Sequence, residues 1–263
     1  MSAQKWVRQF SMWGLNGLFA VSLSHASTDV DINDLTDRGS ISDTPHVVPN
    51  KKWLIEGGYQ YQALKVDGPL STAPQAQITR GVNFNTELFV ILPSYYSLKK
   101  PPASGFDTLS LGSKHELIQG NDWLVSIQGI VALPGGSFDF GHHSVGGQLN
   151  AMATYSLNTK VSLAGMLGLA TVSEPNLIGG GRLYSCNPSV VLVYTPIEKV
   201  NAFVELFGNT KTDIFGGSIW AADCGLVYKI AENTTLDFEF AQNLSHDRFN
   251  YNHYLGGGVT ALF

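Results

Sequence analysis

The sequence has few charged residues and no long apolar run beyond its first 26 residues. Charged residues make up 14% of the 263 residues, against roughly 25% in ordinary soluble domains. No later stretch approaches the roughly eighteen consecutive apolar residues that a membrane-spanning helix needs. Mean hydropathy is nearly neutral at +0.03, while glycine reaches 28 residues and aromatic residues 11%. This composition excludes a bundle of membrane helices and favours apolar residues interleaved with small polar ones.

Cysteine and catalytic motifs are equally scarce. The two cysteines, Cys186 and Cys224, lie in separate apolar runs, and their spacing leaves both a disulfide and two free thiols open. The sequence contains no Gly-x-Ser-x-Gly elbow and no His-Glu-x-x-His helix. We therefore predict no catalytic residue, no metal site and no cofactor.

The first 26 residues have the features of a secretory signal peptide. Lys5 and Arg8 precede the apolar stretch "MWGLNGLFAVSL", and Ser24 and Ala26 are small residues at the cleavage positions. A membrane anchor is the competing interpretation, but the run is short and contains Gly14, Asn16 and Gly17. Removing residues 1–26 leaves 14 basic against 21 acidic residues. This acidic balance argues against nucleic acid as a partner.

The remaining chain divides into a polar tail and a series of strand-like runs. Residues 27–50 show no sustained period, and we expect an N-terminal periplasmic tail or a plug in the lumen of a barrel. From residue 51 to 263, apolar and polar residues alternate and no helical period persists. The approximate bounds of the runs are 52–62, 75–83, 86–97, 106–117, 122–133, 144–156, 160–172, 182–195, 199–208, 216–229, 234–243 and 253–263.

The connections between these runs fall into two populations. Short turns such as "SLNTK", "TPIEK" and "IAENT" follow even-numbered runs, whereas longer loops such as "KKPPASG" and "PGGSFDFGHH" follow odd-numbered runs. In an up-and-down sheet these populations lie at opposite ends, as in outer-membrane barrels. We therefore predict an all-β fold, a transmembrane antiparallel β-barrel of about twelve strands over residues 51–263.

Aromatic residues and charged residues separate onto opposite faces of the predicted strands. On the apolar face, beside the short turns, are Trp53, Trp123, Tyr155, Tyr194, Tyr228 and Phe263, which we interpret as a membrane girdle. On the polar face are Glu56, Arg80, Glu87, Lys114, Glu116, Glu205, Asp223, Asp237 and Glu239. A charge near the bilayer midplane costs a few kcal/mol, so we expect these groups in the lumen. Two roles stay open for them, an ion network that includes Arg38 of the tail and a site that selects solutes.

Several stretches resemble the transporter-like outer-membrane family named for the "MetA-pathway of phenol degradation". They include "LTDRGSISDTPHVVPNKKWLIEGGYQY", "LSLGSKHEL", "VSLAGMLGLA", "DCGLVYKIAENTTLDFEF" and "YLGGGVTALF". Thr36, Asp37 and Arg38 match the tail of the family, whereas the three residues that follow depart from it. Glu56, Arg80, Lys114, Glu205, Asp223 and Asp237 fall at polar positions that the family tends to keep, and Ile130 replaces an acid that it usually has. The resemblance implies an outer-membrane barrel linked to uptake of small aromatic or hydrophobic compounds.

The combined prediction is a channel in the outer membrane of a Gram-negative bacterium, for passive uptake of small solutes. Its expected partners are outer-membrane lipids, the barrel assembly machinery, which reads a terminal aromatic residue such as Phe263, and a small-molecule solute. A structural or adhesive barrel with a closed lumen is the alternative. An outer-membrane hydrolase is the third and least favoured class, and a serine within hydrogen-bond reach of His115 would support it.

Overall fold

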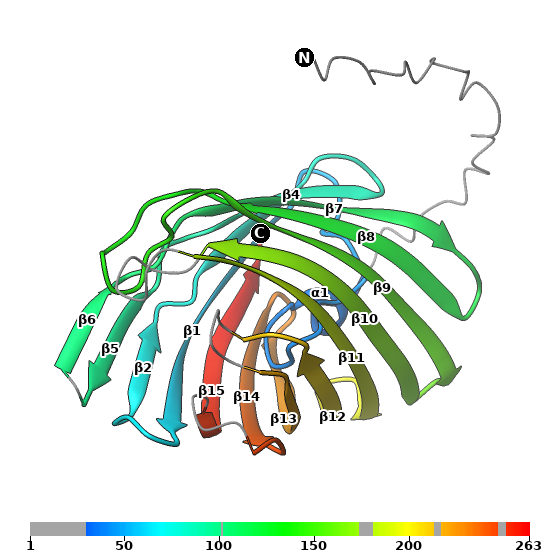
Figure 1. The fold of residues 1–263 in the computed structure, drawn as a ribbon. Coiled ribbons are helices and arrows are strands. Elements are labelled where there is room, and N and C mark those ends of the chain that lie inside the picture. Colours follow the sequence, from blue (N-terminus) through cyan, green and yellow to red (C-terminus); the bar gives the residue numbers. More distant parts are fainter. Residues whose placement is uncertain (1–29, 101, 174–180, 213–216, 247–250) are drawn as a thin grey trace, which may run out of the picture.

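The fold is a single antiparallel sheet that closes on itself. The computed structural model describes residues 30–100, 102–173, 181–212, 217–246 and 251–263 (Figure 1). Within these ranges the elements are α1 (Ile32–Leu35), β1 (Trp53–Leu64), β2 (Leu70–Ala73), β3 (Gln77–Gly81), β4 (Thr86–Ile91), β5 (Tyr95–Lys99), β6 (Pro102–Phe106), β7 (Ser110–Gln119), β8 (Trp123–Ala132), β9 (Gly146–Asn158), β10 (Val161–Ser173), β11 (Arg182–Ile197), β12 (Val200–Asn209), β13 (Ile219–Ala231), β14 (Thr234–Asn243) and β15 (Tyr251–Leu262). Closure is made by β15, which pairs with β1 from Leu54 opposite Leu262 onward.

The fifteen described strands make a barrel wall of twelve strands, because three of the wall strands are each divided into two segments. β1 pairs with β3 near its start and with β2 near its end, so β2 and β3 are two halves of one wall strand. In the same way β4 continues as β5, and β6 continues as β7. The predicted twelve-stranded antiparallel barrel is therefore confirmed.

Part of the segment expected to be the loop "KKPPASG" belongs to strands instead, since β5 extends to Lys99 and β6 begins at Pro102. β5 and β6 pair from Lys99 opposite Pro102 to Tyr95 opposite Phe106. β6 is the last strand in the order of the sheet, and an edge strand tolerates proline because its missing N–H removes no ladder hydrogen bond. The wall is therefore taller at β5 and β6 than the sequence pattern indicates (Figure 1).

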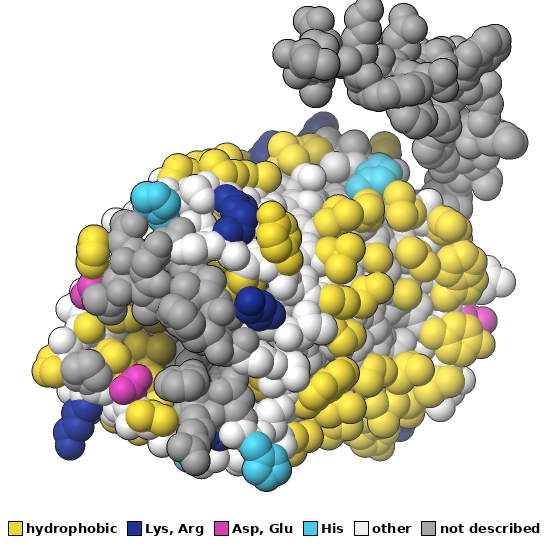
Figure 2. Space-filling model, viewed as in Figure 1, with side chains coloured by type: hydrophobic (Ala, Val, Ile, Leu, Met, Phe, Trp, Pro, Cys, Tyr) yellow, Lys and Arg dark blue, Asp and Glu magenta, His cyan; other side chains and the backbone are white. Residues whose placement is uncertain are grey.

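Apolar side chains of the strands are exposed and polar ones are buried, which is the reverse of the pattern in a soluble protein. In β12, Val204 and Leu206 are 53% and 42% exposed, whereas Glu205 between them is 4% exposed. A strand with this pattern presents apolar groups to lipid and polar groups to the lumen. Figure 2 shows hydrophobic side chains gathered over the outer wall on the right of the view. Among the described residues, no helix is long and apolar enough to cross a membrane.

The two ends of the barrel differ in their connections. Only two residues join β9 to β10, β11 to β12, and β13 to β14, and we call the end where they lie the short-turn end and its opposite the long-loop end. The helix α1 packs at the short-turn end, where Ile32, Leu35 and Val48 form a small apolar cluster with Leu54 of β1. A second apolar cluster, around Phe207 and Tyr254, lies toward the long-loop end. Most of the space between the clusters is lined by polar side chains.

Candidate functional site in the lumen

Residues 30–50 form a loop inside the barrel that enters and leaves at the short-turn end. Thr44 holds the two arms of the loop together, because its hydroxyl donates to the carbonyl oxygen of Asp34 at 2.7 Å and its amide to Oδ1 of Asp37 at 2.9 Å. The returning arm ends against the wall, where the amide of Lys51 donates to the carbonyl oxygen of Gly81 at 2.9 Å. We call residues 30–50 the lumen loop.

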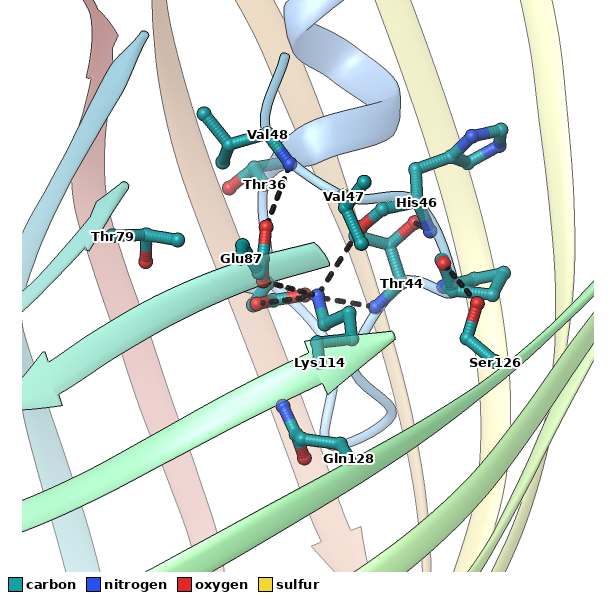
Figure 3. Close-up of polar contacts among 12 residues, drawn as sticks. Thr36, Thr44, His46, Val47, Val48, Thr79, Glu87, Lys114, Ser126 and Gln128 are labelled. Atoms are coloured by element: carbon teal, nitrogen blue, oxygen red, sulfur yellow. Dashed lines mark hydrogen bonds and ion pairs between the residues drawn. The ribbon is translucent and has the colours of Figure 1, made fainter. Parts of the chain in front are cut away.

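The lumen loop is fastened to one side of the wall through Lys114 of β7 (Figure 3). The ammonium group of Lys114 lies 3.0 Å from both carboxylate oxygens of Asp37 and 3.2 Å from Oε1 of Glu87, and it donates to the carbonyl oxygen of His46 at 3.3 Å. Lys114 and Glu87 are each 1% exposed. A buried charge of this kind is tolerated only when it is paired and hydrogen-bonded. The contact therefore joins the loop and the wall as one unit.

Arg38 makes the second ionic contact, on the opposite side of the barrel. Its Nε lies 3.2 Å and its Nη2 3.4 Å from the two carboxylate oxygens of Asp237 on β14. Gly58 and Gly258, which face each other across β1 and β15, make room for the guanidinium group. A Cβ atom at either glycine would overlap Arg38. Sequence reasoning missed these glycines, although the runs "GGYQY" and "LGGGV" carry the signal that a backbone approaches closely there.

Carboxylates of the wall bind backbone amides of the lumen loop. Glu56 accepts from the amide of Asp37 at 3.1 Å, and Glu205 accepts from the amides of Ile41 at 2.8 Å and Ser42 at 3.1 Å. On the returning arm, Glu116 and Glu87 accept from the amides of residues 47 and 48 at 3.0 and 2.6 Å. A buried backbone amide needs a hydrogen-bond acceptor, and these acids supply it. The sequence could not show this role, because a backbone amide is the same at every position.

Three acids on adjacent strands form a cluster beyond the tip of the loop. Asp223 of β13 stands opposite Glu205 of β12, and Glu239 of β14 accepts a hydrogen bond from the hydroxyl of Tyr254. Asp223 is 6% exposed, and its carboxyl group interacts with those of Glu205 and Glu239. Carboxyl groups this close cannot all be ionised, so the cluster holds protons between its members.

The structure brings eight of the nine expected lumen residues to the inner face. They are Glu56, Glu87, Lys114, Glu116, Glu205, Asp223, Asp237 and Glu239. The prediction for Arg80 is wrong. Arg80 pairs with Trp53 across β1 and β3, and its guanidinium carbon lies 4.5 Å from the centre of the Trp53 ring. Residues that stand directly opposite share a face of the sheet, so Arg80 points outward with Trp53.

The six aromatic residues assigned to the girdle all have exposed side chains. They are Trp53, Trp123, Tyr155, Tyr194, Tyr228 and Phe263. Trp123 stands opposite Tyr155 across β8 and β9, and Trp53 and Phe263 exchange backbone hydrogen bonds of 3.0 and 2.8 Å. These pairs place rings from consecutive strands next to each other at the short-turn end.

Three titratable groups of the lumen loop have shifted pKa values. Burial raises the pKa of Asp34 from 3.8 to about 6, and the neighbouring charge of Asp31 raises it further. Burial lowers the pKa of His46 from 6.5 to about 4, and the nearby ammonium group of Lys114 lowers it further. Burial raises the pKa of Asp43 from 3.8 to about 7, with a further rise from Asp37 that Lys114 partly opposes. All three shifts favour the neutral form of the side chain.

An empty chamber of about 300 Å³ lies beside the tip of the loop. Gln60, Gln77, Tyr96 and Glu239 line its wall side, and residues 37–41 and Asp43 line its loop side. The ring of Tyr96 stacks on that of Phe140, with ring centres 5.4 Å apart. The chamber therefore combines hydrogen-bonding groups with an aromatic surface, as sites for small organic molecules do.

The described residues contain no group of three or more His, Cys, Asp or Glu side chains that could hold a metal ion. Nδ1 of His115 lies 2.7 Å from the hydroxyl of Thr86, so its close partner is a threonine. Cys186 and Cys224 are free thiols on β11 and β13, with β12 between them.

Comparisons with known proteins agree with this architecture. Residues 36–263 match the model of a family described as "Putative MetA-pathway of phenol degradation". Among solved structures, the chain is similar to the KdgM porin, with 12% identity, 80% of this chain and 99% of the porin covered, and a TM-score of 0.54. The NanC porin gives 9% identity, 80% and 98% coverage, and a TM-score of 0.55. No curated protein matches the sequence. These likenesses establish a porin-type barrel, a fold of the Gram-negative outer membrane.

Proposed function

Because the chain belongs to the outer-membrane family of the "Putative MetA-pathway of phenol degradation", we propose that it is a passive channel for small solutes, aromatic and hydrophobic compounds among them. The observation that carries this proposal is the chamber of about 300 Å³ that remains in the lumen beside the lumen loop. An engineered cavity of roughly 150 Å³ already accepts benzene. The chamber is therefore large enough for a single substituted ring.

The charges of the lumen favour neutral and cationic solutes. In the described residues, seven acidic side chains of the wall face inward against two bases, Lys114 and Lys229. A ring of acids selects for cations in a narrow pore. A KdgM porin has been solved in complex with oligogalacturonate, which is a polyanion. The acidic lumen of this chain argues against such a solute here.

The outer surface supports two further partners. Exposed leucine, valine and aromatic side chains cover the outward face of the wall, so outer-membrane lipids are its expected surroundings. A barrel of this kind reaches the membrane through the barrel assembly machinery, which we propose as its partner during insertion. Neither partner contacts the lumen.

Planar-bilayer recording of the refolded mature chain tests the channel. Discrete conductance steps with a reversal potential that indicates cation selectivity in a KCl gradient are the expected result. Swelling of liposomes in small neutral aromatic solutes would extend the result to uncharged molecules. Silence in both assays, from a barrel shown to be folded by heat-modifiable migration, would replace the channel with the closed structural barrel.

A further inference from the structure

We infer that solutes cross this barrel through a side passage between the lumen loop and strands β9–β13, and that the narrowest part of the passage, beside Asp43 and His46, determines which solutes pass. This inference rests on the proposed channel function, since it names the route and the residues that would select. Three empty volumes that share lining residues trace the passage.

The first volume opens at the short-turn end. It measures about 600 Å³ and lies between the start of the lumen loop and the turn that joins β9 to β10. Asn33 and Asp34 line the loop side, and Ser162 and Asn201 line the wall side. Its lining is predominantly polar, as expected for a water-filled entrance.

The second volume is the waist of the passage and measures about 120 Å³. It shares Asn33, Asp34, Ser162 and Asn201 with the first volume, so the two are continuous. On the loop side the waist is bounded by residues 42–46, and on the wall side by Thr154, Val191, Val193 and Phe203. Since water occupies about 30 Å³ in the liquid, the waist holds only a few water molecules or one small solute.

The third volume is the chamber of about 300 Å³ described above. It shares Arg38, Ser40 and Asp43 with the waist. Gln60, which lines it, lies in the half of β1 that pairs with β2, toward the long-loop end. Asp43 and Arg38 are therefore the charged groups that line both volumes, each from the loop side.

The opposite side of the lumen loop is closed. There Lys114 pairs with Asp37, the hydroxyl of Ser126 donates to the carbonyl oxygen of Pro45, and Glu87 accepts from the amide of residue 48 (Figure 3). No ion pair in the described ranges joins the loop to β9, β10 or β11. The loop thus adheres closely to β4, β7 and β8. Toward β11–β13 it is held at separate points, by Asp31 with Lys229 and by Ser42 with Ser189 and Glu205. Beside these contacts the waist stays open, and small and apolar side chains line its wall.

Substituted cysteines test the route in the full mature chain with Cys186 and Cys224 replaced by serine. Thr154→Cys and Val193→Cys place thiols on the wall of the waist, and Ser126→Cys places one on the closed side as the matched control. A small charged methanethiosulfonate reagent is added to the folded barrel, and labelling is followed by mass spectrometry and by conductance. We expect rapid labelling and loss of most of the conductance at residues 154 and 193, and no labelling at residue 126. Ser162 lines both the entrance and the waist, so Ser162→Cys replaces either waist variant that fails to fold.

The two proposals fail in different ways. Waist cysteines that label as slowly as Ser126→Cys in a conducting barrel would overturn the side passage and leave the channel standing. Absent conductance with rapid labelling of the waist would overturn the channel while the passage remains as a water-filled gap. Labelling at residue 126 alone would place the route on the opposite side of the lumen loop and would also overturn the inference.

Discussion

The ammonium group of Lys114 lies 3.0 Å from Oδ1 of Asp37 and 3.2 Å from Oε1 of Glu87, so the lumen loop and the wall share one buried positive charge. Removing that charge leaves two carboxylates together in a buried site. We expect Lys114→Met to lower the free energy of unfolding by about 3–5 kcal/mol, the usual cost of breaking a buried pair. Denaturant unfolding in detergent, followed by tryptophan fluorescence, measures it. Lys160→Met, on an exposed turn, is the matched control, and an equal effect in both variants would contradict the prediction.

Arg38 offers a direct measure of whether the lumen loop is docked. Trypsin cleaves after arginine, and docking against Asp237 protects this peptide bond. Because a Cβ atom at Gly258 would overlap the guanidinium group, Gly258→Ala should weaken docking by roughly 1–3 kcal/mol, as overpacking does. Cleavage after Arg38 should then accelerate. Gly129→Ala is the control, since a Cβ atom there meets nothing within 4 Å. An unchanged rate of cleavage in Gly258→Ala would show that Arg38 does not need the space beside Gly258.

Asp43 should make ion selectivity depend on pH. Its pKa is raised to about 7, chiefly by burial and then by Asp37, so the carboxyl group is neutral at pH 6 and ionised at pH 8. We expect cation selectivity, measured as the reversal potential in a KCl gradient, to increase between these values. Asp43→Asn should remove most of the increase, and Asp34, whose pKa burial raises to about 6, accounts for the remainder. A wild-type profile that stays flat from pH 6 to 8 would contradict the assignment of Asp43 to the passage.

His46 should make docking of the lumen loop weaken in acid. Its pKa is about 4 when docked against 6.5 when free, because burial and then Lys114 disfavour the imidazolium ion. A lowered pKa means that docking is fully stable above pH 6.5 and loses stability as the pH falls towards 4. The raised pKa of Asp43 acts in the opposite sense between pH 3.8 and about 7, and that of Asp34 between pH 3.8 and about 6. The test is therefore made in Asp43→Asn, and the contribution of Asp34 cancels when two variants that both keep it are compared. Hydrogen exchange of residues 36–48 should speed up below pH 6.5 in Asp43→Asn, and not in Asp43→Asn combined with His46→Gln.

Arg80 should have no influence on the pore. Its guanidinium group lies over the ring of Trp53 on the outer face, where a cation–π contact contributes about 0.5–1 kcal/mol at an exposed site. Arg80→Ala should therefore lower stability slightly and leave the reversal potential unchanged. Asp237→Asn, which faces the lumen and binds Arg38, should alter selectivity. A shift of the reversal potential in Arg80→Ala would return this residue to the lumen.

The barrel itself could be predicted because its signals are local. Alternation with period two, short turns after every second run, and aromatic residues beside those turns depend only on neighbours along one strand. The error at Arg80 has the same origin. Arg80 shares its face of β3 with Ile78, and a charged side chain beside the short-turn end does not by itself identify the lumen face. Pairing with Trp53, which involves another strand, resolves it.

The sequence by itself determined the class of the protein. Its strands alternate and carry few charges, so their apolar side chains can be buried only in lipid and their charged side chains only in a lumen. What only the tertiary structure decided is how that lumen is occupied. Glu56, Glu87 and Glu205 bind backbone amides of the lumen loop, which no sequence pattern marks. The side on which the loop adheres follows from Lys114, Asp37 and Glu87, which come from three separate segments. A passage beside the loop is a property of space between segments, so it exists only once the barrel has closed around residues 30–50.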